Sequence, residues 1–200
     1  EDGEIAFELE EAYVKFLRVL NGLQLTVGKK LVGFGKVNSV HQHHRPYADQ
    51  PQVLENFFGD HGLLGEGANL SYLLPAPFFI QLDAGAWKIR GHEHHAEELE
   101  VAGLFDSDGN PVDEILVPGE CGDEFGLADE TYTSRLWMSF PFGKKSELDM
   151  GISAAKAYGS HFCNHLDKAR VFGGDLTLRF WPGAHSRLIL QNEYMLSLIH

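Results

Sequence analysis

Alternation of apolar and polar residues with a period of two runs through most of the chain and constrains its fold more than any other feature. In LQLTVG, Leu23, Leu25 and Val27 alternate with Gln24 and Thr26. Successive side chains of a β-strand point to opposite faces, so this period indicates strands with one apolar face. Apolar stripes with helical spacing are almost missing. We therefore predict an all-β protein of about eight strands, drawn from GEIAFELEEAYVKFL, LQLTVG, ANLSYLL, FFIQLDAGAW, TSRLWMSF, ELDMGISA, GGDLTLRF and SRLILQNEYMLSL.

One of these segments breaks the pattern. In IAFELEEAYVKF the apolar residues of the alternation stand at odd positions at first (Ile5 and Phe7) and at even positions later (Ala12 and Val14). An extra residue in one strand produces such a slip. We predict a β-bulge near Glu10 and Glu11.

The connections between the predicted strands alternate in length. Short turns rich in Pro, Gly or Asn are expected at 19–22, 75–77, 141–146 and 182–186, and long polar segments at about 30–65, 91–131 and 159–170. In an up-and-down antiparallel sheet every second connection falls at the same end. All short turns should therefore lie at one end of the sheet and all long loops at the other.

This asymmetry is typical of bacterial outer-membrane barrels, which have short periplasmic turns and long extracellular loops. A sheet can span the hydrocarbon only if it closes and pairs all its backbone groups. Seven aromatic residues flank the short turns, as a belt at a membrane interface requires. They are Phe16, Phe78, Phe79, Phe140, Phe142, Phe180 and Trp181. We predict one transmembrane β-barrel domain over residues 1–200. A soluble antiparallel sandwich or lipocalin-like barrel would also alternate and is the alternative fold.

Polar residues recur opposite the apolar ones along the predicted strands. In a porin such a face lines an aqueous lumen. The predicted pore-lining residues are Gln24, Asp83, Arg135, Asp149, Asp175, Arg179 and Glu193.

Composition narrows the classes of partner. The net charge is −13 and the pI is about 5.2, which argues against a nucleic-acid partner because a phosphate backbone requires a basic face. No apolar run is long enough for a transmembrane helix. Cys121 and Cys163 could pair or stay free, so they leave the redox compartment open. The chain starts without Met and stops inside a predicted strand, so we expect both ends to be cut.

Several pieces of the chain resemble a known family. These are LQLTVGKKLVGFGKVN, HRPYADQP, GLLGEGANLSYLLP and RVFGGDLTLRFWPG. They are similar to porin-like Gram-negative outer-membrane barrels, some related to phosphate-selective porins and some labelled zinc-regulated outer-membrane receptors. The full barrel of that family has more than eight strands, so the resemblance implies that this chain is an internal fragment.

Of the eleven histidines, nine fall in the three long loops. Neutral imidazole is the usual ligand for zinc, and two or three His with a carboxylate can form a site. The candidate metal ligands are His41, His43, His44, His92, Glu93, His94, His95, His161 and His165. A solvent-facing loop with no specific role is the alternative. Catalysis by His92 and Glu93 lacks a nucleophile or an oxyanion arrangement, so we predict no enzyme activity.

Taken together, the sequence predicts an outer-membrane porin or channel for small polar solutes, with divalent metal such as zinc as the favoured solute. No cofactor is required, and zinc or another divalent cation in the loops is the predicted ligand. The predicted partners are membrane lipid and lipopolysaccharide, because an acidic loop with twelve carboxylates collects divalent cations. The sequence leaves open whether the protein forms a homotrimer. The alternatives are a metal-binding or adhesion module anchored by a barrel and a soluble metal-binding β-sandwich.

Overall fold

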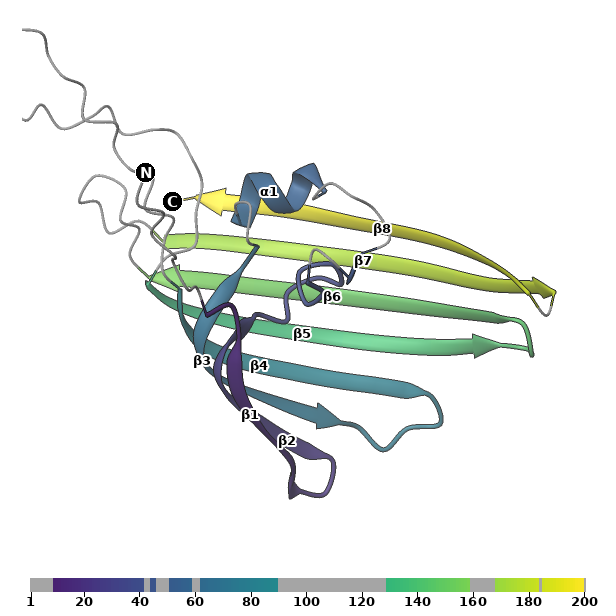
Figure 1. Ribbon diagram of the computed structural model, residues 1–200, viewed down its shortest axis with the longest axis horizontal. Helices are drawn as coiled ribbons and strands as arrows, with labels where there is room; N and C mark the ends of the chain where they lie inside the picture. Colours follow the sequence, from purple (N-terminus) through teal and green to yellow (C-terminus); the bar gives the residue numbers. More distant parts are fainter. Residues whose placement is uncertain are drawn as a thin grey trace, which may run out of the picture.

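The computed structural model describes residues 9–41, 44–45, 51–58, 62–89, 129–158, 168–183 and 185–199. Eight antiparallel strands form one sheet in chain order, and the sheet curves so that it has a concave side (Figure 1). The strands are β1 Ala12–Leu20, β2 Leu23–Leu31, β3 Leu64–Leu73, β4 Phe79–Ile89, β5 Asp129–Phe142, β6 Ser146–Tyr158, β7 Lys168–Gly183 and β8 Ser186–Ile199. The predicted all-β, up-and-down architecture is therefore confirmed. Within the described residues the sheet is not closed, because β1 and β8 form its two edges.

The four short turns join β1 to β2, β3 to β4, β5 to β6 and β7 to β8. All four lie at one end of the sheet, at the right and lower side of Figure 1, and the longer connections leave the strands at the opposite end. Positive backbone dihedrals at Gly22 (φ 76°) and Gly143 (φ 63°) allow two of these turns to be tight. The predicted separation of short and long connections is confirmed.

The two faces of the sheet differ in chemistry. Pairing runs without a register shift from β2 to β7, so each strand keeps its polar residues on the same, concave face. We call this face the polar face. The opposite, apolar face carries most of the large hydrophobic side chains that are exposed. Examples are Leu70, Leu82, Ile152, Phe172, Leu176, Leu178, Leu190, Leu196 and Leu198.

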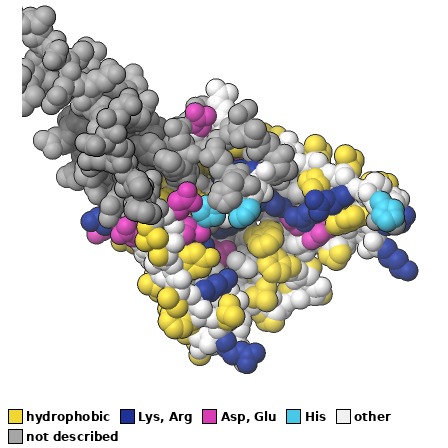
Figure 2. All heavy atoms as spheres, in the orientation of Figure 1, with side chains coloured by type: hydrophobic (Ala, Val, Ile, Leu, Met, Phe, Trp, Pro, Cys, Tyr) yellow, Lys and Arg dark blue, Asp and Glu magenta, His cyan; other side chains and the backbone are white. Residues whose placement is uncertain are grey.

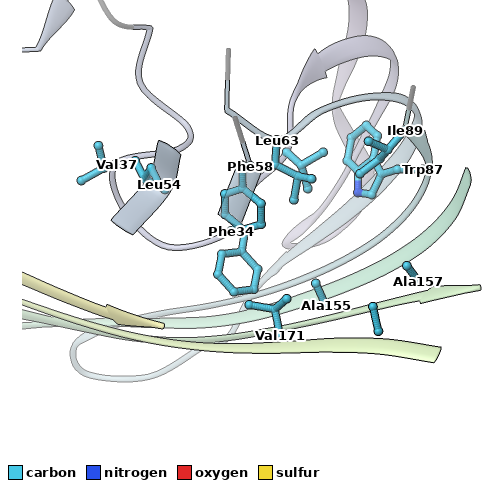
Figure 3. Close-up of a cluster of buried hydrophobic side chains, with 12 residues drawn as sticks. Phe34, Val37, Leu54, Phe58, Leu63, Trp87, Ile89, Ala155, Ala157 and Val171 are labelled. Carbon is cyan, nitrogen blue, oxygen red and sulfur yellow. The ribbon is translucent and has the colours of Figure 1, made fainter. Parts of the chain in front are cut away.

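The connection between β2 and β3 folds back over the polar face. We call residues 32–40 the crossing segment. It is followed by α1, Gln52–Phe58, and together they form the buried apolar cluster with the strands below (Figure 3). Phe34 is fully buried, lies over Val171 and contacts Phe58 edge to face with ring centroids 5.2 Å apart. The cluster thus packs on the concave side of the sheet.

Two details differ from expectation. The predicted bulge near Glu10 and Glu11 is wrong: β1 starts at Ala12, and its register with β2 shifts between Phe16 and Leu20. Glu11 lies just outside the strand, and its carboxylate makes contacts that are described below. The helix α1 was not expected, since its seven residues are too few to show a periodic pattern. Among the described residues no helix is long and apolar enough to cross a membrane.

Candidate functional site

The structure places all seven predicted pore-lining residues on the polar face. In the antiparallel ladders Asp83 on β4 is directly opposite Arg135 on β5, and Asp175 on β7 is directly opposite Glu193 on β8. Gln24 is opposite Ser71, which in turn is opposite Asp83. Asp149 on β6 is opposite Ser139 on β5, and Arg179 on β7 is opposite Glu147 on β6, which places both on the same face. The alternation that predicted one shared face was therefore read correctly, and the structure adds which side chains contact one another.

A buried ion pair occupies the centre of the polar face. The Arg135 guanidinium donates to both carboxylate oxygens of Asp175, at 2.6 and 3.1 Å, and to Ser153 Oγ at 3.0 Å. Arg135 and Asp175 belong to β5 and β7, so the pair reaches across β6. Gly151 on β6 makes this possible, because a Cβ there would overlap both side chains. A bidentate pair of this geometry is strong and directional.

A second charged group lies nearer the short turns. Asp149, almost fully buried, accepts from Lys36 Nζ at 2.6 Å and from Arg179 at 2.7 Å. Arg179 also contacts the Glu147 carboxylate at 3.2 Å, and Ser139 Oγ donates to Glu147 at 2.8 Å. Two carboxylates and two cations therefore alternate, which offsets the cost of burying each charge.

Asp83 is held by uncharged donors. Gln81 Nε2 donates to both of its carboxylate oxygens at 3.0 Å, and Ser71 Oγ and Asn69 Nδ2 also contact it. These four side chains come from β3 and β4. In the part of the chain that the structure describes, the hydrogen bonds to the Asp83 carboxylate thus come from amide and hydroxyl groups and not from a cation.

The crossing segment is tied to the polar face by three polar contacts. The Gly35 N–H donates to Ser153 Oγ at 3.0 Å, the Val37 N–H donates to Glu193 Oε2 at 3.2 Å, and Lys36 binds Asp149. Gly35 has φ 60°, and a Cβ there would collide with the Glu193 carboxylate. The segment therefore reaches from β2 as far as β8.

Lys36 and Glu147 are residues of the candidate site that the sequence analysis did not predict, and Lys36 was the harder to find. It stands in a long polar connection, LVGFGKVN, with no alternation to assign it to a face. The two glycines that flank Phe34 were the available signal, because glycine permits close backbone approach and turning. They could not show which strands the segment would reach.

Of the predicted metal ligands, His41 and His44 lie in the described part of the chain. His41 is held between two carboxylates: its Nε2 is 2.8 Å from Glu11 and its Nδ1 is 3.5 Å from Glu10. His44 lies near it, with ring centroids 6.4 Å apart. The remaining predicted ligands lie outside the described residues: His43, His92, Glu93, His94, His95, His161 and His165. In the described ranges no three His, Cys, Asp or Glu side chains converge to hold a metal ion.

The contact between Glu11 and His41 fastens the far end of the crossing segment. Glu11 Oε1 also accepts from the Leu31 N–H at 2.7 Å, so one carboxylate joins β2 and the segment that follows it. Burial alone would raise the pKa of Glu11, but the hydrogen bonds from His41 and Leu31 favour the ionised form and lower the pKa overall.

Comparison with known proteins finds similarity to an uncharacterized protein. No protein-family model matches the chain, and no solved structure matches it. The chain is similar to an uncharacterized protein of Aquifex aeolicus (strain VF5), with 32% identity over 206 aligned residues that cover 98% of the chain and 39% of the relative. The chain therefore spans well under half the length of that relative.

The buried pair gives a prediction about stability. Arg135→Gln leaves Asp175 buried without its guanidinium, so the free energy of unfolding should fall by about 3–5 kcal/mol. The double variant Arg135→Met/Asp175→Leu removes both charges and should lose clearly less. Denaturant titration of the two variants measures this, with Lys144→Gln at an exposed turn as the control. Equal losses for the single and double variants would contradict the prediction.

Glu11 gives a prediction about pH. Because its pKa is lowered in the folded state, ionised Glu11 stabilises the fold above the pKa of the unfolded chain, and this contribution disappears as pH falls through the lowered value. Protection of the Leu31 amide against hydrogen exchange, corrected for intrinsic rates, should therefore decrease on acidification in that range. In Glu11→Gln the protection should be weaker at neutral pH and should not change over the same range. Lys144→Gln, in the exposed turn between β5 and β6, is a control that keeps the carboxylate.

Proposed function

We propose that the chain forms part of an outer-membrane β-barrel of porin type that lets small polar solutes cross. The observation that carries the proposal is the reversed chemistry of the two faces. Every strand residue that is both polar and buried belongs to the polar face, among the residues described, whereas large apolar side chains are exposed on the other face. A water-soluble sheet buries its apolar face, while a membrane barrel exposes that face to lipid.

The dimensions of the apolar face suit a bilayer. The strands have between 9 and 16 residues, and a tilted transmembrane strand needs about 9–11. Aromatic side chains gather toward the short turns: Phe78 contacts Phe140 with centroids 4.5 Å apart, and Phe142 and Phe180 are exposed. Aromatic girdles of this kind mark the boundary between hydrocarbon and headgroups. These features support a membrane location with the short turns at one interface.

A spanning sheet must also close, because unpaired edge groups are costly in hydrocarbon. In the described sheet the edges are β1 and β8. A protein as long as the Aquifex relative has more than enough chain to supply further strands to these edges. We therefore infer a barrel larger than eight strands, with the polar face turned toward its lumen.

The solute path would follow the polar face past the crossing segment. The described polar face carries nearly equal numbers of both signs: Asp83, Glu147, Asp149, Asp175 and Glu193 against Lys15, Lys30, Arg135, Arg179 and Arg187, with Lys36 above them. The net charge of −13 of the whole chain is what favours cations over anions. Zinc gathered by the histidine-rich loops, with lipopolysaccharide around them, remains the proposed case of a divalent solute.

One observation favours a second candidate. The crossing segment and α1 cover part of the polar face, and a lumen filled in this way would not conduct. The barrel would then act only as the anchor of a surface module that binds metal or adheres. Conductance separates this candidate from the channel.

Membrane insertion can be tested at two neighbouring positions in β8. Leu190 is on the apolar face and 58% exposed, while Gln191 is exposed on the polar face. Leu190→Arg should lower the stability of the inserted protein by about 2–4 kcal/mol if the site is near the bilayer midplane. Gln191→Arg should change it much less. Refolding of the full-length protein into lipid vesicles, followed by urea titration, gives both values. If Leu190→Arg is neutral, or the protein stays in the aqueous phase, the soluble β-sandwich is favoured instead.

Conduction can be tested at Lys36. In planar bilayers the full-length protein should show discrete open steps, with micromolar zinc reducing the current if zinc binds at the mouth. Lys36→Gln removes the cation beside Asp149, so the permeability ratio of potassium to chloride should rise severalfold. Lys88→Gln, an exposed site on the apolar face, should leave the ratio unchanged. An inserted protein that stays closed would favour the anchored module.

A further inference from the structure

Among the described residues, the exposed charged side chains at the short-turn end of the sheet are all cationic. Arg18 precedes the first turn, Lys144 and Lys145 form the turn between β5 and β6, and Arg187 follows the turn between β7 and β8. We call these four residues the cationic rim. In the described part of this end the nearest acid is Glu147, which is half-buried on the polar face and bound to Arg179. None of the described ion pairs includes a member of the rim, so its positive charge is not neutralised by a bound carboxylate.

Three members of the cationic rim lie on adjacent turns. The Trp181 N–H donates to the Lys145 carbonyl at 2.9 Å, and Lys145 Nζ donates to the Pro182 carbonyl at 3.3 Å. These contacts hold the turn between β5 and β6 against the end of β7, and Arg187 is next to Ser186, which pairs with Gly183. In Figure 2, Lys and Arg side chains in dark blue mark the tips of the hairpins.

The opposite end of the sheet has both signs of charge. Lys88 is paired across the ladder with Glu66 on one side and Glu130 on the other. Glu10 and Glu11 also lie at this end, beside His41. In a chain of net charge −13, an end whose exposed charges are only positive is therefore a local feature of the structure and not a consequence of composition.

The cationic rim borders the apolar face at the level of the aromatic side chains. Phe142 is exposed two residues before Lys144, and exposed Phe180 on β7 lies just before the Trp181 and Pro182 that contact Lys145. Aromatic residues of a membrane protein lie at the headgroup boundary, and Lys and Arg beyond them extend their charges into the headgroup layer. The geometry would thus bring the rim to the depth of lipid phosphates.

We propose that the cationic rim binds the phosphates of anionic phospholipids in the leaflet at the short-turn end. This inference rests on the proposed membrane embedding and adds a lipid preference to it. Each Lys or Arg near an anionic surface favours association by about fivefold, so two rim charges together should contribute roughly 25-fold under low screening. Salt should weaken the preference, since these side chains are exposed.

The test compares two double variants of the full-length protein in vesicles of equal parts phosphatidylglycerol and phosphatidylcholine. Lys144→Gln/Arg187→Gln removes two rim charges, and Lys88→Gln/Arg170→Gln removes two exposed cations from the opposite end. Electron spin resonance of spin-labelled lipids gives the association constant of phosphatidylglycerol relative to phosphatidylcholine. We expect the wild type and the Lys88/Arg170 variant to prefer phosphatidylglycerol, and the rim variant to lose at least fivefold of that preference.

The outcomes separate this proposal from the one on which it rests. A wild-type protein that inserts into pure phosphatidylcholine but shows no preference for phosphatidylglycerol would overturn the lipid proposal and leave the barrel proposal standing. Equal losses in the two double variants would also overturn it, because the preference would not belong to the short-turn end. A protein that inserts into no vesicle would overturn both. The single variant Lys144→Glu, in an exposed turn, should reduce the preference even if the double variant refolds poorly.

Discussion

The backbone pairing in constant register from β2 to β7 is the constraint on which the other features of this protein depend. A slip of one residue in any strand would move its charged side chains to the apolar face and its leucines to the polar face. With the register fixed, Arg135 can reach Asp175 across two strand spacings, and Asp149 can meet Arg179 on the next strand. The ion pairs in turn disfavour a slip, because each would lose its partner.

Small residues adapt the polar face to what lies on it. Gly151 leaves space for the pair between Arg135 and Asp175, and a Cβ on Gly173 would be 2.9 Å from the Phe34 ring. Ala155 is buried close to Val171 below that ring. Glycine weakens a strand interior by its flexibility, so its use here fits a requirement for close approach. The crossing segment and the charged network therefore share one surface without competing for the same volume.

The sequence allowed the strands and their faces to be predicted because alternation is a local property. Asp83, Asp149 and Glu193 could be assigned to one face from their immediate neighbours alone. Lys36 could not, because its contact with Asp149 joins residues 113 positions apart, and no local pattern specifies that distance. The predicted bulge was wrong although the alternation does change phase near Glu11. The strand β1 starts only after that change, at Ala12, and no local pattern shows where a strand begins. Closure of the sheet depends on which strands pair with its two edges. Alternation within a strand does not specify those partners, so it could not predict closure.

The face of the sheet that is covered distinguishes this structure from a soluble β-sandwich. A β-sandwich packs a second sheet on the apolar face, leaving the polar face to water. Here the covering elements, the crossing segment and α1, lie on the polar face, where Lys36 and the backbone of Gly35 and Val37 make polar contacts. Among the described residues nothing packs on the apolar face, and Ile152 in the middle of β6 is 61% exposed. A single sheet covered on its charged side and bare on its leucine side is the arrangement that the proposed membrane barrel requires, and it differs from that of a sandwich.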